Sequence, residues 1–377
     1  MRKIVIINTS NLQKGGALQV AKSFIYETKN HPNYDFHIIL GKATKNIFNE
    51  MTLFGNTNNF FYTLNVSPTD SIFNLFYYKI LLRKLELKIR PNFVISVFGP
   101  CYWRPSSTHI IGFANGYYLY EDSPFFLFFN FNKSFLYRLK RRFQLMQLKY
   151  EADIFWLETN DAKLRFTSIM KIDSKKSIVA SNTASFYFSN KLFYKYIQLP
   201  NKKKVRLLYV SSYYVHKNFE IIPEVYKILL ERGYDTEFLL TINKLDYEKN
   251  HLLKNCKGIH NIGNVDPEFC PYLYNNSDII FVPSLLETFT AIYPEAMISQ
   301  KPIVTTNLDF AKSICGNAAL FYKYDDPNDA ANKIIYLIED KSLINDLVSK
   351  GLDRLKTFDS GETRFAKILN KIETCTF

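Results

Sequence analysis

Short apolar runs alternate with longer amphipathic segments along the chain, and this alternation predicts most of the secondary structure. Residues 17–29 and 72–89 carry apolar side chains at the spacing of one helix face, and the second segment follows a Thr-Asp-Ser capping cluster at 69–71. Short runs of apolar residues predict strands. In the first half of the chain these strands cover residues 3–8, 36–40, 92–98, 108–113, 153–157 and 176–180.

The same alternation begins again after residue 204. Strands are predicted at residues 206–210, 237–241, 258–262, 278–282 and 302–306, and helices at residues 219–231, 326–339, 342–350 and 361–374. Such alternation gives parallel sheets with helices on both faces, so we predict an α/β protein with two Rossmann-like domains. The boundary falls in the polar stretch 181–204. We expect domains at residues 1–185 and 200–355, followed by a C-terminal helix in 356–377.

The most informative stretch is residues 278–306, which reads strand, loop, helix, strand. Glu287 lies in the loop after the first of these strands, and seven residues separate it from Glu295. Thr288 or Thr290 is expected to cap the helix between them. The backbone N–H groups at the start of a helix attract phosphate. Two carboxylates that flank such an anion site can hold hydroxyls at both ends of a nucleotide diphosphate-sugar.

The pattern Glu287-x7-Glu295, preceded by Pro-Ser and followed by Ala-Met, resembles the signature of the retaining glycosyltransferases of family 4. The resemblance implies that Glu287 contacts the transferred sugar and that Glu295 holds the ribose hydroxyls of the donor. It also implies that backbone amides between the two glutamates bind the diphosphate. In this chain those amides belong to Phe289, Thr290 and Ala291.

The resemblance implies an architecture as well, the GT-B glycosyltransferase fold. In that fold two Rossmann-like domains face each other across a cleft, with the donor on the C-terminal domain and the acceptor on the N-terminal one. The final helix is expected to pack back on the first domain. One position departs from the family pattern, because the family has a small residue or glycine near Gln300. We therefore expect the shape of that loop to differ.

Further candidate residues lie at other strand ends. Gly15 and Gly16 separate the first strand from the first helix, where glycine lets the backbone approach a phosphate. The same pair stands in this loop in many family members, although an ordinary strand–helix turn is the alternative. Lys217 follows the first strand of the second domain and can neutralise a departing diphosphate. The family often has an arginine five residues earlier, where this chain has Ser212, and the neighbouring His216 is either a donor or a surface histidine without a role.

Loops rich in Gly, Pro and aromatic residues follow two strands of the first domain, at 99–105 and 112–118. Loops at strand ends often line a site. The family often places a polar residue here against the sugar, and Asn115 is our candidate, with core packing of these loops as the alternative. We interpret His109, which opens a strand, as structural.

Composition narrows the class of partner. The chain has 377 residues and a formal net charge of +13, which favours nucleic acid, acidic lipid or an anionic substrate. No signal peptide is visible, and no apolar run approaches the roughly 18 residues that span a bilayer, so we expect a cytoplasmic protein, at most peripheral on the membrane. Neither a metal site nor a cofactor is predicted, because the cysteines are scattered without metal-ligand spacing. They are Cys101, Cys256, Cys270, Cys315 and Cys375.

Residues 124–150 form the most distinctive stretch outside these motifs. Aromatic residues give way to Arg138, Lys140, Arg141, Arg142 and Lys149, interleaved with Leu and Phe, which is typical of an interfacial helix on anionic lipid. An amphipathic domain helix with a solvated basic face is the main alternative. A nucleic-acid surface is the second, although no RNA-binding motif accompanies it.

These observations predict a metal-independent, retaining hexosyltransferase that uses a nucleotide-diphosphate-sugar donor. By resemblance, its acceptor is a glycan or a lipid-linked glycan in surface polysaccharide biosynthesis, such as lipopolysaccharide O-antigen assembly. One alternative is a nucleotide-sugar epimerase on the same fold. Another is a basic membrane- or nucleic-acid-binding protein with a degenerate sugar-nucleotide site.

Overall fold

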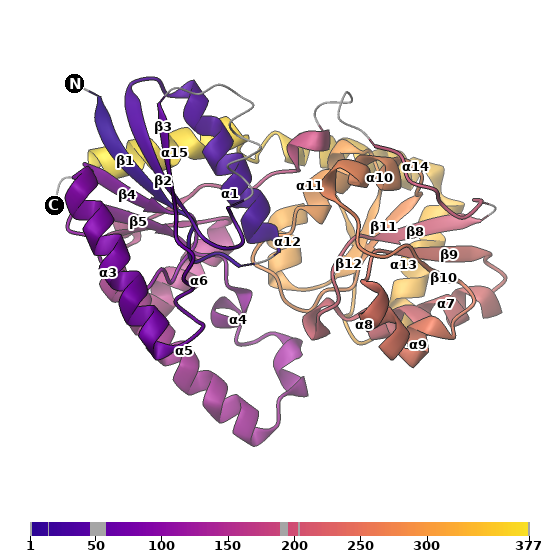
Figure 1. Cartoon of the computed structure of the whole chain (residues 1–377). Coiled ribbons are helices and arrows are strands. Elements are labelled where there is room, and N and C mark those ends of the chain that lie inside the picture. The colour runs from indigo at the N-terminus through magenta and orange to yellow at the C-terminus, as the bar shows by residue number, and fades with distance from the viewer. Residues whose placement is uncertain (1, 14, 46–57, 189–194, 203, 376–377) are drawn as a thin grey trace. The chain divides into compact units, whose positions relative to one another are not determined.

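The computed structural model describes residues 2–13, 15–45, 58–188, 195–202 and 204–375. By its internal contacts the chain divides into two compact units, each built on one parallel sheet (Figure 1). The first unit comprises Met1–Leu119, Asn130–Asn182 and Asp359–Phe377. The second comprises Tyr120–Phe129 and Thr183–Phe358.

The first unit has a seven-stranded parallel sheet in the order β3-β2-β1-β4-β5-β6-β7. Successive residues of β1 point to opposite faces, so Val5 and Ile7 join the core under α1 and α15, while Ile6 joins the core under α3. The strands are β1 (Lys3–Asn8), β2 (Tyr34–Leu40), β3 (Asn59–Thr63), β4 (Phe93–Ser96), β5 (Thr108–Gly112), β6 (Ile154–Leu157) and β7 (Ser177–Val179). The α-helices are α1 (Gly16–Glu27), α3 (Ile72–Ile89), α4 (Gly116–Leu119), α5 (Phe131–Glu151), α6 (Asn160–Met170) and α15 (Gly361–Thr374).

The second unit has a six-stranded parallel sheet in the order β10-β9-β8-β11-β12-β13. Its strands are β8 (Val205–Tyr209), β9 (Thr236–Leu240), β10 (Ile259–Asn261), β11 (Ile279–Val282), β12 (Ile303–Thr306) and β13 (Leu320–Tyr322). Its α-helices are α7 (Ile222–Glu231), α8 (Lys244–Lys249), α9 (His251–Lys254), α10 (Cys270–Asn275), α11 (Ile292–Ile298), α12 (Asp309–Cys315), α13 (Pro327–Glu339) and α14 (Lys341–Leu355).

Short 3₁₀ turns connect several of these elements. They are η1 (Thr28–Asn30), η3 (Pro124–Phe128), η4 (Ser174–Lys176), η5 (Phe186–Phe188), η7 (Val215–Lys217), η8 (Phe219–Ile221) and η9 (Pro267–Phe269). The helix predicted over 219–231 is therefore split, because η8 precedes α7.

The two parallel sheets confirm the predicted fold class. The predicted helices at 72–89 and 361–374 are found with the same bounds, whereas α14 runs five residues past the end predicted for it. Strands β3 and β13 were not predicted. Residues 120–129 were expected in the first domain, but they pack with the second unit.

The last helix, α15, packs on α1 of the first unit, and the Phe365 and Phe24 rings lie 4.5 Å apart. Arg364 is buried and donates to the Oδ1 of Asn182 at 2.7 Å and to the Oγ of Ser23 at 2.9 Å. Burying a cation is costly unless hydrogen bonds replace its hydration. The two contacts therefore fix this helix in one position on its unit.

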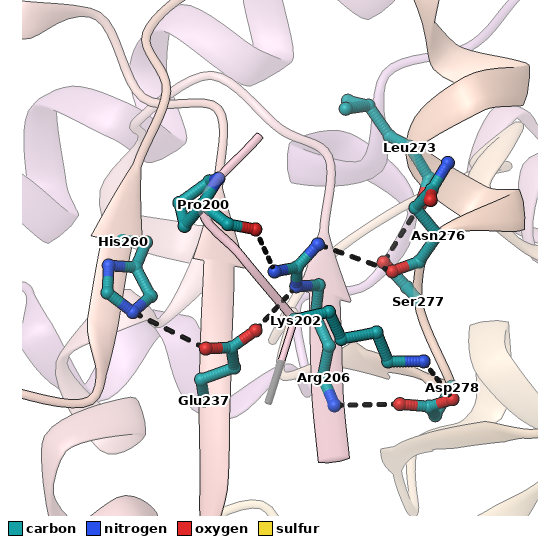
Figure 2. Close-up of polar contacts among 9 residues, drawn as sticks. All are labelled: Pro200, Lys202, Arg206, Glu237, His260, Leu273, Asn276, Ser277 and Asp278. Atoms are coloured by element: carbon teal, nitrogen blue, oxygen red, sulfur yellow. Dashed lines mark hydrogen bonds and ion pairs between the residues drawn. The ribbon is translucent and has the colours of Figure 1, made fainter. Parts of the chain in front are cut away.

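A buried arginine anchors the amino edge of the second sheet (Figure 2). Arg206, on β8, is 2% exposed, and its Nε donates to the Oε1 of Glu237 at 2.6 Å. Its Nη2 donates to the carbonyl oxygen of Pro200 at 2.7 Å, and its backbone N–H donates to Asp278 at 2.9 Å. A buried ion pair needs such additional hydrogen bonds to offset its lost hydration. Arg206 therefore holds Pro200, which precedes β8 in the chain, at this edge of the sheet.

Candidate active site

Lys217 and Glu287 form an ion pair at the carboxyl edge of the second sheet. Lys217 ends the η7 turn that follows β8, and Glu287 lies in the loop after β11. Strands β8 and β11 are parallel neighbours, so the loops that follow them meet at one edge of the sheet. The two side chains are only 12% and 11% exposed, so little water screens their charges.

Hydrogen bonds fix the two loops that carry this pair. The backbone N–H of Leu285 donates to the carbonyl oxygen of His216 at 2.7 Å, which ties one loop directly to the other. The Tyr209 hydroxyl, buried beneath them, donates to the carbonyl oxygen of Lys217 at 3.3 Å and lies 2.8 Å from the Oγ of Ser284. Burial raises the pKa of Tyr209 well above its usual value, so the hydroxyl keeps its proton for these bonds.

Glu295, the second predicted carboxylate, lies on α11 and is 8% exposed. Its Oε2 accepts a hydrogen bond from the Tyr274 hydroxyl at 3.0 Å, and its Oε1 lies 3.5 Å from the backbone nitrogen of Ser185. Burial raises the pKa of Glu295 to about 7. The side chain therefore changes its charge near neutral pH, which an exposed glutamate does not do.

The helix between the glutamates begins later than predicted. The first residue of α11 is Ile292, and the N-cap position is held by Ala291, whose methyl side chain cannot accept a hydrogen bond from the first turn of the helix. The prediction that Thr288 or Thr290 occupies the cap was therefore wrong, although the Thr290 hydroxyl lies 3.4 Å from the backbone nitrogen of Ile292. The Phe289 ring packs edge-on against another phenyl ring of the unit. That the amides of Phe289, Thr290 and Ala291 bind a diphosphate stays a prediction.

The position at which the sequence departs from the family pattern has unusual backbone geometry. Gln300 has a φ of 54°, in the left-handed region that glycine adopts most easily. It follows α11, where the Gln300 N–H donates to Met297 at 3.0 Å and the Lys301 N–H donates to Ala296 at 2.9 Å. These two bonds are typical of a helix end with a left-handed residue. The loop therefore keeps a glycine-like shape in spite of its glutamine.

His216 and Ser212 were predicted to bind the substrate, and they have different environments. The His216 ring stacks on Tyr214, with centroids 5.5 Å apart, and meets the Phe125 ring edge-on at 5.9 Å. Burial lowers the pKa of His216 to about 4, so the imidazole is neutral at physiological pH. Ser212 is exposed. A neutral imidazole can donate one hydrogen bond but adds no second positive charge beside Lys217, and the binding role of both residues stays a prediction.

The remaining candidate residues lie in the first unit. Gly15 precedes α1 with a φ of 73°, and a Cβ atom at Gly15 or Gly16 would meet nothing within 4 Å, so the backbone is open to an approaching ligand. Asn115 follows β5, and its Oδ1 accepts a hydrogen bond from the Tyr117 N–H at 3.1 Å. This bond gives Asn115 a local structural role at the start of α4. Sugar contact by Asn115 and phosphate contact by the glycines stay predictions.

Several supporting residues were not found from the sequence. Tyr274 lies on α10, a helix of six residues that was not predicted, and Tyr209 is the last residue of a strand. Ser123 lies 162 positions from the Leu285 carbonyl oxygen to which its hydroxyl donates. A polar residue beside a strand end is only weak evidence of a role in a site. The residues next to it in the sequence do not reveal its hydrogen-bond partner.

The described residues contain neither a cluster of metal-ligating side chains nor a helix that could span a membrane. In that part of the chain, no group of three or more His, Cys, Asp or Glu side chains could hold a metal ion. None of the described helices combines the length and the hydropathy needed to cross a bilayer.

Comparison with known proteins agrees with this geometry. Residues 191–354 match the family model of the glycosyl transferases group 1. A glycosyltransferase of capsular polysaccharide biosynthesis from Staphylococcus aureus, CapM, is 27% identical over 175 residues, which cover 45% of this chain and 45% of that protein.

Solved structures resemble the whole chain. A glycosyltransferase from Rickettsia africae has a TM-score of 0.73 at 16% identity, and 100% of each chain is covered. Anabaena HepE, solved with UDP and glucose, has a TM-score of 0.69 at 13% identity, with 99% of this chain and 100% of that chain covered. The fold is thus the GT-B fold of glycosyltransferases. The predicted resemblance to the group 1 glycosyltransferases is confirmed over residues 191–354, which lie in the unit that holds Lys217, Glu287 and Glu295.

Proposed function

We propose that this chain is a retaining glycosyltransferase that moves a hexosyl group from a nucleotide-diphosphate-sugar to a glycan or lipid-linked glycan. The buried ion pair of Lys217 and Glu287 carries the proposal. It brings a cation together with the carboxylate proposed to bind the sugar, at the sheet edge where ligands of parallel α/β folds bind. Glu295 supplies the carboxylate for the ribose hydroxyls. The HepE structures with UDP-glucose support a nucleotide-sugar donor.

In the proposed reaction, the bond between the anomeric carbon and the diphosphate oxygen breaks, and its electron pair stays on the diphosphate. Lys217 and the backbone amides before α11 stabilise this developing charge. The acceptor hydroxyl attacks the anomeric carbon from the same face, and its proton passes to the departing phosphate oxygen. Glu287, held beside Lys217, orients the sugar hydroxyls. Positioning and electrostatics supply the rate enhancement in this scheme.

The central test is the Glu287→Ala variant. We expect transfer to fall at least about a hundredfold, because the sugar loses its orienting carboxylate, while the circular dichroism spectrum stays that of the wild type. Transfer at a near-normal rate would remove the assignment. Product analysis without an acceptor separates the epimerase alternative, because only an epimerase converts the donor alone. Calorimetry with uridine and guanosine diphosphates tests the binding-protein alternative, which failure to bind either nucleotide would favour.

The outer face of α5 supports a membrane-bound acceptor. Six exposed apolar side chains follow one another at spacings of three or four residues, which places them on one stripe of the helix. The residues between positions 131 and 150 include six Lys and Arg residues and no Asp or Glu. Figure 1 shows α5 as a long helix at the side of its sheet. The stripe consists of Phe131, Phe135, Leu139, Phe143, Met146 and Tyr150.

We propose that this stripe lies in the interface of an anionic bilayer, as expected for residues 124–150. A helix with an apolar face and basic flanks gains both apolar burial and attraction to acidic headgroups. A second copy of the chain is a poor occupant, because pairing two α5 stripes would bring twelve positive side chains together. On this proposal the protein is peripheral on the cytoplasmic face of the membrane.

Vesicle co-sedimentation tests the membrane contact. Phe135→Ser/Phe143→Ser should reduce binding to phosphatidylglycerol-containing vesicles at least about tenfold, because two aromatic rings that would enter the bilayer are lost. Leu164→Ser/Leu245→Ser is the matched control, since both leucines are at least 70% exposed but lie on other helices. Binding that does not depend on anionic lipid, or an equal loss in the control, would contradict the proposal.

A further inference from the structure

A short segment that the sequence places between α4 and α5 packs inside the second unit. This segment, Tyr120–Phe129, is called the strap below. Ser123 is buried, and its Oγ donates to the carbonyl oxygen of Leu285 at 2.6 Å while accepting from the Phe125 N–H at 3.2 Å. The Phe125 ring is 4% exposed and meets His216 edge-on. The strap is therefore held by both a polar and an apolar anchor.

Both anchors reach the loops of the catalytic pair. Leu285, which accepts from the strap, lies two residues before Glu287. His216, which packs against the strap, directly precedes Lys217. The backbone bond from Leu285 to His216 joins these two contact points. The strap thus touches the two loops where they are tied to each other.

The loop that carries Glu287 needs such external support. Residues 283–290 lie between β11 and α11 and belong to neither a helix nor a strand. The position of Glu287 therefore depends on individual hydrogen bonds to this loop rather than on a regular ladder. Misplacing a catalytic group by about 1 Å can cost about a hundredfold in rate.

We infer that the strap is a positioning element of the active site, in which the Ser123 hydroxyl fixes the Leu285 carbonyl and thereby the Glu287 carboxylate beside Lys217. This inference rests on the proposed glycosyl transfer. Phe125 completes the contact by covering His216. In the sequence the strap joins α4, which follows Asn115, to α5. The stretch of chain that contains Asn115 therefore continues into the segment that positions Glu287 beside Lys217.

The Ser123→Ala variant tests this inference. We expect its kcat to fall about tenfold, while the KM for the donor changes less than about twofold, because the lost bond orients Glu287 but does not touch the nucleotide. Ser123→Thr keeps the hydroxyl and should restore most of the rate. The matched control is Ser277→Ala, because Ser277 is also buried and donates to a backbone carbonyl, that of Leu273, at 2.8 Å (Figure 2). It lies just before β11, at the opposite end of that strand from Glu287.

Hydrogen exchange gives a readout that does not depend on turnover. Ser123→Ala should speed exchange of the peptide over residues 283–289 at least about fivefold, and Ser277→Ala should leave that peptide unchanged. Equal losses of kcat and of melting temperature in the two variants, with unchanged exchange at 283–289, would overturn the inference. If the wild type neither binds nor turns over any nucleotide sugar in a panel that includes UDP-glucose, the proposed function fails, and the exchange experiment still decides whether Ser123 orders the loop.

Discussion

Binding of a nucleotide sugar should strengthen about tenfold between pH 6 and pH 8, because Glu295 ionises in that interval. Burial raises the pKa of this carboxyl to about 7. It is therefore about one-tenth ionised at pH 6 and about nine-tenths ionised at pH 8. A carboxylate accepts hydrogen bonds at both oxygens, whereas a protonated carboxyl has to donate one. The two ribose hydroxyls assigned to Glu295 meet a full acceptor only in the ionised form.

The same shift affects the stability of the ligand-free protein. The pKa of Glu295 rises from 4.5 to about 7, and a shift of that size corresponds to about 3 kcal/mol. Because the folded pKa is the higher one, this contribution to the free energy of unfolding is fully present below pH 4.5 and is lost as the pH rises through about 7. Bound ribose hydroxyls compensate the ionised carboxylate. A nucleotide sugar should therefore raise the melting temperature more at pH 8 than at pH 6.

Calorimetric titration with UDP-glucose at pH 6, 7 and 8 measures the effect. Its sugar-linked diphosphate lacks the terminal phosphate group that titrates near pH 6 in UDP. Glu295→Gln should remove the pH dependence and leave the affinity near the value at pH 6. Tyr274→Phe should raise the pH at which the affinity is halfway through its change, because the Tyr274 hydroxyl donates to the Glu295 carboxylate and lowers its pKa. An affinity that is constant from pH 6 to 8, or a slope that persists in Glu295→Gln, would refute this reasoning.

Two further predictions concern stability. Gln300→Gly should raise the free energy of unfolding by about 1 kcal/mol in urea denaturation, because glycine adopts the observed φ of 54° without steric cost; an unchanged or lower value would contradict this. His109 is buried with its Nδ1 2.9 Å from the carbonyl oxygen of Glu151, and burial lowers its pKa to about 4. Because the folded pKa is the lower one, about 3 kcal/mol of stability should be lost as the pH falls from 6.5 towards 4. In His109→Gln the free energy of unfolding should change less between pH 6.5 and pH 4 than in the wild type. An equal loss of stability in the variant would contradict the role given to His109.

Helix ends were predictable where capping residues are local. Helix α3 begins and ends where the pattern places it, because the Ser71 hydroxyl accepts from the Asn74 N–H at 3.1 Å and Arg90 adopts a left-handed conformation after the last turn. Strand β3 was not predictable in the same way. Its five residues lie at the edge of the sheet and none of them is buried, so the alternation of buried and exposed positions is weak.

The residues of the candidate active site could be proposed one by one from the sequence, but their arrangement could not. A carboxylate or lysine after an apolar run identifies Glu287 and Lys217 separately, because the carboxyl ends of parallel strands form ligand sites. Their pairing depends on β8 and β11 being neighbours, although 70 positions separate the two residues in the sequence. The contribution of Ser123 depends on a segment that crosses into the other unit, and no local pattern encodes that crossing.

The return of α15 to the first unit determines the order in which the protein can mature on the ribosome. Phe365, Ile368, Leu369 and Ile372 belong to the main core of the first unit, yet in the sequence they follow the whole of the second unit. All the chain of the second unit has emerged before these residues do. The unit whose synthesis begins first therefore completes its core last, and until α15 has emerged the apolar face of α1 that it covers stays exposed.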